Sequence, residues 1–300
     1  MSSDQNPPLI DVDCNLMHAD LKSLFGKANH SPLDILFEDA VKDHNIIAML
    51  SPSSTIQEAK NGLAFFKDQS SFNILTTIGV HPYQVPATSP SRDVYDEMKL
   101  IVQENPTLVC AVGECGLDTS PGFPPLDHQI PWFQHQIQFA KDMQLPLFVH
   151  ERGAFEVTMN LLQSFTGKVI IHCFTGTAVE CQQYIERGYS ISLSGYICKP
   201  TDTRECVPLI PLSQLMLETD APYMGFATCR QLYLDKNMDS MATLNSKQRK
   251  RLTTGTYPNV PSSLPKVLDQ VVELLDGTYT REEVARQTTE NAIAFFGFKV

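Results

Sequence analysis

The segment Val109–Asp118 reads V-C-A-V-G-E-C-G-L-D, and its composition decides how the rest of the chain is interpreted. The run from Leu108 to Val112 is short, apolar and rich in β-branched residues, and it stops at Gly113. This length and the flanking glycines favour a strand over a helix segment. Glu114 follows at once, and a carboxylate at the end of a buried strand is costly unless a cation or a donor meets it. We therefore predict that Glu114 holds a metal ion at the centre of an enzyme site.

Short apolar runs like this one alternate with helical patterns along most of the chain. The predicted strands are Leu9–Cys14, Ile46–Leu50, Ile74–Val80, Leu108–Gly113, Pro146–Val149, Val169–Ile171, Tyr189–Leu193 and Leu215–Leu217. The predicted helices between them are Pro32–Asp43, Thr55–Gln69, Val94–Glu104, Asp127–Met143, Ala154–Phe165, Thr177–Arg187 and Arg204–Ile210. Eight strands that alternate with helices, without a linker, predict an α/β protein with a (β/α)₈ TIM barrel. We expect a single domain over residues 1–300. A doubly wound sheet, with another strand order, stays open.

The last quarter of the chain is less regular. A long polar stretch, Met224–Pro261, contains the basic run K-Q-R-K-R at Lys247–Arg251. A run of like charges is more often a solvated surface than a binding site, and we favour that interpretation. Three further helices are predicted at Leu264–Leu275, Arg281–Arg286 and Glu290–Phe296.

Composition limits the class of protein. The chain has 300 residues, of which 42% are hydrophobic, and a net charge of −11. That sign excludes a protein that coats nucleic acid through its overall field, but not an enzyme that neutralises a few phosphates locally. The eight cysteines form no C-x-x-C pair, the first residues are polar, and no apolar run approaches membrane length. We expect a reduced monomer of the cytoplasm or the nucleus, with no membrane partner.

Candidate metal ligands follow several of the predicted strands. They are Asp13, His81, Glu114, His150, His172 and Asp220. The carboxyl ends of parallel barrel strands meet at one face, so these side chains should converge there. A single histidine after an apolar run is usually structural, but this many equivalent placements are far less expected by chance. Histidine and carboxylate together suit a divalent ion, which can acidify water and polarise a phosphoryl oxygen.

Other charged residues are weighed against these. Arg152 lies two residues beyond His150 and could pair bidentately with an anionic substrate group. The remaining histidines lack the strand-end placement, and we interpret them as structural or exposed. They are His18, His30, His44, His128 and His135.

Five motifs and the C-terminal tail together resemble the TatD family of metal-dependent deoxyribonucleases, within the metal-dependent hydrolase superfamily of barrels. The motifs are G-V-H-P-Y (Gly79–Tyr83), V-G-E-C-G-L-D (Val112–Asp118), V-H-E-R (Val149–Arg152), I-H-C-F-T-G-T (Ile171–Thr177) and L-E-T-D-A-P-Y (Leu217–Tyr223). The tail runs from Leu264 to Gly297 and includes T-T-E-N-A at Thr288–Ala292. The resemblance covers nearly the whole chain.

The resemblance implies a role for each matching residue. Glu114 is similar to a carboxylate that bridges two metal ions, with His150 and His172 as the other ligands of one ion. Asp220 is similar to a residue that binds the second ion or takes the proton of the attacking water. His81 and Arg152 resemble residues that contact the scissile or a neighbouring phosphate.

The first strand departs from the family pattern. Many relatives carry H-x-H there, whereas this chain has Asp13-Cys14-Asn15. The branch that contains TatD itself also lacks the pair. Asp13 and Asn15 are then weak oxygen ligands beside Glu114 and Asp220, a set that suits Mg²⁺ or Mn²⁺ better than Zn²⁺. Of one or two ions, one should be weakly held or bound only with substrate.

Two further departures concern the rim of the site. Tyr83 stands where relatives often have another histidine. Pro258-Asn259-Val260-Pro261 stands where the family tends to read R-N-E-P. The lost arginine and glutamate predict a looser C-terminal loop, or phosphate contacts from Lys247–Arg251 instead.

From this resemblance we expect a Mg²⁺- or Mn²⁺-dependent nuclease. It would hydrolyse single-stranded DNA as a 3′→5′ exonuclease, with RNA as a further substrate. One rival is a hydrolase of a small cyclic amide or ester, although those relatives usually rely on the H-x-H that is absent here. The other rival is a nucleic-acid-binding homologue with little or no catalysis, in which the change at Asp13 and Asn15 marks a dead site.

Overall fold

The computed structural model describes residues 7–24, 31–67, 72–242 and 245–300, and a parallel sheet of eight strands lies at its centre. The strands pair in chain order from first to last, each parallel to the next. Their bounds are β1 Leu9–Asp11, β2 Ile46–Ser51, β3 Asn73–Ile78, β4 Val109–Asp118, β5 Leu147–Arg152, β6 Val169–Ile171, β7 Ser190–Leu193 and β8 Leu215–Leu217.

Backbone hydrogen bonds join the first strand region to the last. The amide of Val12 donates to Leu217 O over 3.1 Å, and that of Asn15 donates to Ala221 O over 2.8 Å. Cys14 and Ala221 form a parallel bridge between these bonds. The sheet therefore closes on itself beyond the ends of β1 and β8, and the predicted (β/α)₈ barrel is confirmed.

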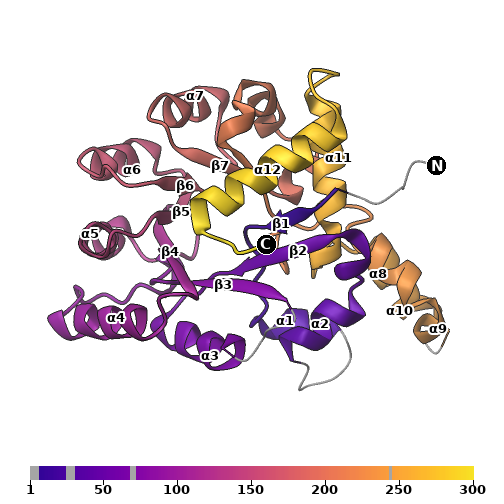
Figure 1. Ribbon diagram of the computed structural model, residues 1–300, viewed down its shortest axis with the longest axis horizontal. Coiled ribbons are helices and arrows are strands. Elements are labelled where there is room, and N and C mark those ends of the chain that lie inside the picture. Colours follow the sequence, from indigo (N-terminus) through magenta and orange to yellow (C-terminus); the bar gives the residue numbers. More distant parts are fainter. Residues whose placement is uncertain (1–6, 25–30, 68–71, 243–244) are drawn as a thin grey trace.

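Helices surround this barrel (Figure 1). The α-helices are α1 Ala19–Leu24, α2 Pro32–Glu38, α3 Ile56–Phe66, α4 Arg92–Glu104, α5 Leu126–Met143, α6 Phe155–Leu162, α7 Ala178–Glu186, α8 Gln231–Lys236, α9 Met238–Met241, α10 Ser246–Thr254, α11 Leu264–Leu274 and α12 Arg281–Phe296. Short 3₁₀ turns are η1 Lys42–His44, η2 Pro82–Gln84, η3 Gly195–Cys198, η4 Asp202–Leu209, η5 Leu212–Gln214 and η6 Pro261–Ser263. None of the helices in the described ranges is long and apolar enough to span a bilayer.

Side chains cap several of these helices where the sequence supplies threonine. Thr55, Thr177 and Thr280 each accept a hydrogen bond from the backbone of the third helical residue. In α7 and α12 a glutamate at that residue also binds the cap backbone, which completes a capping box. Each cap fixes the residue at which its helix begins.

The barrel interior is filled from its amino-terminal end. Inward-facing apolar side chains come from seven strands, among them Ile10, Ala48, Phe148 and Met216. Phe296 and Phe298, at and beyond the end of α12, pack against this cluster. In Figure 1 α12 crosses the barrel and the C-terminus lies near its centre. The last helix thus closes this end of the barrel and leaves the opposite end for a site.

The central strand β4 is longer than the sequence predicts. It continues past Gly113 to Asp118, and its ladder with β5 pairs Gly116 with His150. A Cβ on Gly116, whose φ is +136°, would lie 2.0 Å from His150 O. Glycine is needed here because two backbones approach closely, not because the strand stops. The prediction that the strand ends at Gly113, with Glu114 outside it, is therefore wrong.

Other differences concern strand and helix bounds. The strand β5 likewise runs through His150 to Arg152 rather than stopping at Val149. The two helices predicted from Arg281 to Phe296 are one, α12, because no glycine or proline lies between Arg286 and Glu290 to interrupt it. The helix predicted to reach Gln69 ends at Phe66. Gln69 and His30 lie outside the described residues.

The polar stretch before α11 also has structure that the sequence did not indicate. It contains α8, α9 and α10, and Lys247–Arg251 lies within α10. The helices α8 and α9 are only six and four residues long, and α10 contains one apolar residue, so hydrophobic periodicity gave no signal for them. In Figure 1 they lie at one edge of the molecule, outside the ring around the barrel.

Candidate active site

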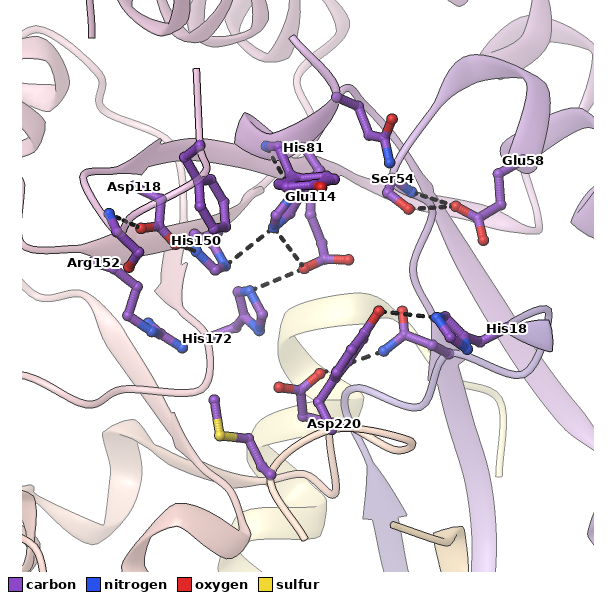
Figure 2. A pocket seen from close by; sticks show the side chains of 17 residues that line it. His18, Ser54, Glu58, His81, Glu114, Asp118, His150, Arg152, His172 and Asp220 are labelled. Atoms are coloured by element: carbon purple, nitrogen blue, oxygen red, sulfur yellow. Dashed lines mark hydrogen bonds and ion pairs between the residues drawn. The ribbon is translucent and has the colours of Figure 1, made fainter. Parts of the chain in front are cut away.

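A cavity of about 480 Å³ contains most of the predicted site residues. Those that line it are Asn15, His81, Glu114, His150, Arg152, His172 and Asp220. They come from or follow six different strands, as the parallel barrel requires. The eighth predicted residue, Asp13, is fully buried beside His172. Figure 2 shows His81, His150, His172 and Glu114 turned toward one another in the middle of this cavity.

Three side chains form what we call the outer group: His81, Glu114 and His150. One ligand atom of each lies within 4.8 Å of the other two. His81 Nε2 is 3.3 Å from His150 Nδ1 and 3.9 Å from Glu114 Oε2. Two imidazole nitrogens and one carboxylate oxygen at this spacing suit a divalent metal ion.

The other ring nitrogen of His150 faces Asp118, at the end of β4. His150 Nε2 lies 2.7 Å from Asp118 Oδ2, and Asp118 Oδ1 accepts a hydrogen bond from Ser120 N over 2.7 Å. A carboxylate in this place orients the ring and directs Nδ1 at the cavity. Sequence reasoning missed this role of Asp118. The signal was available, because Glu114 and Asp118 are four residues apart and a strand places them on one face.

A second set, the inner group, consists of Asp13, Glu114 and His172. Their ligand atoms also lie within 4.8 Å of one another. His172 Nε2 is 3.2 Å from Glu114 Oε2, and His172 Nδ1 is 3.1 Å from Asp13 Oδ2. Glu114 therefore belongs to both groups, and His150 and His172 fall into different ones. The family resemblance had instead placed these two histidines on one ion.

Glu218 approaches the inner group from behind. Its Oε1 lies 3.7 Å from His172 Nδ1, and its Oε2 accepts a hydrogen bond from Ser192 Oγ over 2.6 Å. Glu218 lies in the quoted motif L-E-T-D-A-P-Y, but its side chain faces inward and no periodic signal distinguished it from an ordinary core neighbour.

Unpartnered buried atoms test whether this inner group fits a metal. Among the residues that the structure describes, nothing makes a well-aligned hydrogen bond with four buried atoms of this region, which are Asp13 Oδ2, both ring nitrogens of His172 and Glu218 Oε1. The short distances around His172 are thus contacts between ligand atoms that point at a common space. Buried polar groups in native proteins are normally satisfied, so a set of orphans this dense calls for a cation. The residues fit a bound divalent ion.

Asp220 and Asn15 close the cavity near β8. Asp220 N donates to Asp13 O over 2.8 Å, and the Asn15 amide donates to Asp13 Oδ1 and to Asp220 Oδ1 over 3.3 and 3.4 Å. Asp220 has a φ of +51°, which turns its side chain into the cavity. Asp220 does not belong to either of the two ligand groups in the described chain.

The two histidine surroundings shift the ring pKa values in opposite directions. Burial and the neighbouring charges of His81, Arg152 and His172 hold the pKa of His150 well below its usual value. Burial also lowers the pKa of His172, but Asp13, Glu114 and Glu218 outweigh it and raise the pKa well above the usual value. A neutral imidazole is ready to bind a metal, whereas a ring among carboxylates favours its protonated form, and a metal ion bound there would take the place of that proton.

The pKa values of the carboxylates in the site also shift in different directions. Burial raises the pKa of Glu114, but His172, His81 and the other cations outweigh it, so the net shift is downward. Burial, together with the charges of Asp220 and Glu114, raises the pKa of Asp13. Burial and the charge of Glu218 raise the pKa of Asp220 to about 7. The inner end of the site thus has more negative charge than nearby cations neutralise.

Arg152 is the one arginine or lysine among the described residues that line the cavity. Its Nη1 donates to Glu151 O over 2.6 Å. The buried Glu151 in turn accepts hydrogen bonds from Ala154 N and Tyr184 Oη over 2.8 and 3.1 Å. This anchoring leaves the guanidinium at the cavity wall, where an anionic group can reach it.

Several cavity residues were not predicted. His18, which we interpreted as structural or exposed, lines the cavity and lies 2.9 Å from Tyr223 Oη. His18 Nδ1 also accepts a hydrogen bond from Asp20 N over 3.1 Å, so a structural role remains compatible with its place on the wall. Phe123 stacks on His150 with ring centroids 6.2 Å apart, and Tyr83 meets Phe123 edge-on at 5.2 Å. Ser54 and Glu58 line another part of the wall.

The C-terminal loop is firmly held, contrary to one expectation. The buried Arg230 donates hydrogen bonds to the carbonyls of Leu252, Gly255 and Pro258. Asn259 Nδ2 donates to Thr219 O over 2.9 Å, next to Asp220. Arg230, the N-cap residue of α8, thus holds the loop in place. Of the basic run, Lys247, Arg249 and Lys250 are not among the described residues that line the cavity.

Comparison with known proteins adds to this geometry. Residues 10–297 match the family model described as TatD related DNase. A protein of Erwinia amylovora named 3′-5′ ssDNA/RNA exonuclease TatD is 32% identical over 262 residues, 85% of this chain and 90% of that protein. A protein of the same name from a Rahnella species is 34% identical over 229 residues, 74% of this chain and 77% of that protein.

Solved structures agree in fold. A hydrolase TatD family protein from Entamoeba histolytica superposes with a TM-score of 0.77 at 21% identity, over 98% of this chain and 99% of that one. At this identity the likeness shows the fold alone.

Proposed function

The chain belongs to the TatD-related DNase family, and on that premise we propose that it is a metal-dependent 3′→5′ exonuclease of single-stranded DNA and RNA. One observation carries the proposal. Two ligand groups share Glu114 at the floor of a cavity that also presents Arg152. Paired ligand sets beside a cation suit a phosphodiester, whose hydrolysis concentrates negative charge on oxygen.

The metal that fits best is Mg²⁺ or Mn²⁺, with Zn²⁺ the weaker fit. Oxygen donors dominate the inner group, where Asp13 and Glu114 face a single histidine. A bound divalent ion supplies positive charge for a phosphoryl oxygen and lowers the pKa of water. His81 is a member of the outer group by its distances to His150 and Glu114. The family resemblance implies that it also contacts the phosphate.

The protein's own residues divide the remaining work. Glu114, His150 and His172 hold the reacting centre, and Asp118 keeps the His150 ring in place. Asp220 orients the attacking water and accepts its proton. The water oxygen bonds to phosphorus while the bond from phosphorus to the upstream O3′ breaks. A nucleoside 5′-monophosphate leaves, and the strand keeps a new 3′-hydroxyl. Arg152 offsets charge on the phosphate.

A monomer is sufficient for this chemistry. Every side chain of both ligand groups, and Arg152 and Asp220 beside them, comes from one chain. The proposal therefore needs no residue from a second copy. Size-exclusion chromatography with light scattering measures that state directly.

The test is the digestion of 5′- and 3′-labelled oligonucleotides, single- and double-stranded, DNA and RNA, with Mg²⁺, Mn²⁺ or Zn²⁺. We expect a 5′-labelled single strand to shorten one nucleotide at a time with Mg²⁺ or Mn²⁺. Asp220→Asn, purified in parallel, controls for contaminating nucleases and should lose activity by about 10²-fold or more. Absence of hydrolysis with every metal would refute the proposal. Activity only on cyclic amides or esters would favour the small-molecule rival.

A further inference from the structure

Ser54 and Glu58 form a polar pair on the cavity wall that the reaction described above does not use. Ser54 follows β2, and Glu58 lies in the first turn of α3. Glu58 Oε2 accepts hydrogen bonds from Ser54 N over 2.8 Å and from Ser54 Oγ over 2.5 Å. Ser54 O in turn accepts from His81 N over 3.0 Å. This chain of hydrogen bonds fixes the Glu58 carboxylate relative to the outer group.

The second oxygen of this carboxylate is available to a ligand. Within the described part of the chain, nothing donates a hydrogen bond to Glu58 Oε1, and Glu58 lines the cavity. Glu58 belongs to neither ligand group. It is therefore a fixed acceptor on the cavity wall, outside both ligand groups. An acidic side chain in such a place binds a sugar hydroxyl well, as acidic residues do with ribose in dinucleotide sites.

The charges of the cavity are arranged asymmetrically around the reacting centre. Arg152 ends β5, whereas the Ser54–Glu58 pair follows β2, with β3 and β4 between them in the barrel. Figure 2 shows Arg152 and the Ser54–Glu58 pair on opposite sides of His81, Glu114 and His172. A phosphate is attracted at the Arg152 side and repelled by the carboxylate at the other side. A strand that continues through the cavity would have to place a phosphate near Glu58.

We propose that the Glu58 carboxylate, held by Ser54, accepts a hydrogen bond from the free 3′-hydroxyl of the terminal nucleotide and excludes a phosphate from that position. The inference rests on the proposed exonuclease function and deepens it. The rest of the strand leaves the reacting centre on the Arg152 side. The cavity then admits strand ends and rejects strand interiors, so this pair explains why cleavage proceeds from an end.

The competing interpretation is purely structural. Glu58 is the third residue of α3, and a glutamate there commonly caps the helix through a backbone N–H. Loss of a cap changes stability but has no reason to change the choice between strand ends. The experiment must therefore measure that choice.

The experiment compares the wild type with Glu58→Gln on three substrates with Mg²⁺ or Mn²⁺. Glutamine keeps an oxygen for Ser54 and presents an amide in place of the free carboxylate oxygen. The substrates are linear single strands with a 3′-hydroxyl or a 3′-phosphate, and a circular single strand. We expect the wild type to cut the 3′-phosphate strand at least about tenfold more slowly and to leave the circle intact, and the variant to lose about tenfold of this preference.

A matched control separates the choice of end from capping. Glu180→Gln changes the third residue of α7, which also caps its helix, but Glu180 lies outside the cavity. It should match Glu58→Gln in thermal stability and keep the wild-type preference. The assignment is overturned if Glu58→Gln retains that preference, or if the wild type degrades the circle.

Binding separates this inference from the proposed function. Fluorescence anisotropy with phosphorothioate strands, which resist hydrolysis, gives the ratio of affinities for 3′-hydroxyl and 3′-phosphate ends. If the wild type hydrolyses nothing, the proposed function fails, and this ratio still decides the role of Glu58. A ratio that Glu58→Gln leaves unchanged would refute the inference, and a ratio that falls toward one would support it.

Discussion

The outer and inner groups share one carboxylate yet differ in almost every other respect. In the outer group the side chains of His81 and His150 are 15% and 12% exposed, whereas His172 and Asp13 in the inner group are 2% and 0% exposed. His150 has cationic neighbours and a firm hydrogen bond to Asp118, whereas His172 lies among carboxylates with its nitrogens unsatisfied.

The difference teaches how one barrel can prepare two unlike ligand groups, each of which we propose to hold a metal ion. In the outer group, burial and positive neighbours keep the imidazoles neutral, so the ligands are ready before any ion arrives. In the inner group, the carboxylates need a cation to offset their mutual repulsion. In this proposal the first group is organised by hydrogen bonds, and the second would be organised by a bound ion. Four experiments test this contrast.

The largest effect should come from Glu114→Gln, which removes the charge that both groups share. We expect kcat to fall on the order of 10³-fold or more, and calorimetric titration with Mn²⁺ to show weaker binding at both positions. Glutamine keeps the volume, so the fold should persist by circular dichroism. Retention of either metal position at wild-type affinity would contradict the shared role of Glu114.

Asp118→Asn should weaken the outer group alone. The variant removes the negative partner of His150 Nε2, 2.7 Å away, and so loosens the ring that faces the cavity. Loss of such a partner lowers metal affinity by about 10- to 100-fold. Mn²⁺ titration should show the weaker position to be the outer one, with the inner one unchanged. An equal loss at both positions would show that the groups are not separable.

Metal removal tests the inner group's need for a cation. We expect a chelator to lower the melting temperature, because a ligand that binds only the folded state at 100 times its Kd contributes about 2.7 kcal/mol. In a barrel of this size that corresponds to a shift of several degrees. Differential scanning calorimetry with and without Mg²⁺ or Mn²⁺ measures it. A melting temperature that does not respond to either ion would contradict the argument from unpartnered atoms.

Asp13→Asn should have the smallest effect on stability. The effect should differ in sign between the metal-free and the metal-bound protein. The amide removes one buried negative charge, so the metal-free protein should gain about 1 kcal/mol of stability. The stabilisation by added metal should fall at the same time. Asp118→Asn is the matched control, because it breaks a hydrogen bond and should destabilise the metal-free protein. If Asp13→Asn also destabilises it, Asp13 acts as a hydrogen-bond partner of His172 rather than as a strained neighbour.

Much of the site was predictable because of one property of parallel barrels. All strands run in the same direction, so residues at their carboxyl ends lie together at one end of the barrel, whatever their side-chain type. His81, His150, His172 and Asp220 could therefore be placed together without a structure. Glu58 and His18 could not, because they lie on a helix and after a loop, where no strand end marks them.

The sequence by itself determined the alternation of strands and helices and the strand ends at which most of the site residues lie. These follow from short-range periodicity, which each segment has independently of its neighbours. Only the tertiary structure decided which nitrogen of which histidine faces which carboxylate. It showed that β4 carries Glu114 in its interior and ends at Asp118, so that the strand supplies the shared ligand and the partner of His150. Such pairings depend on packing between strands distant in sequence, and a local sequence pattern carries no information about that packing.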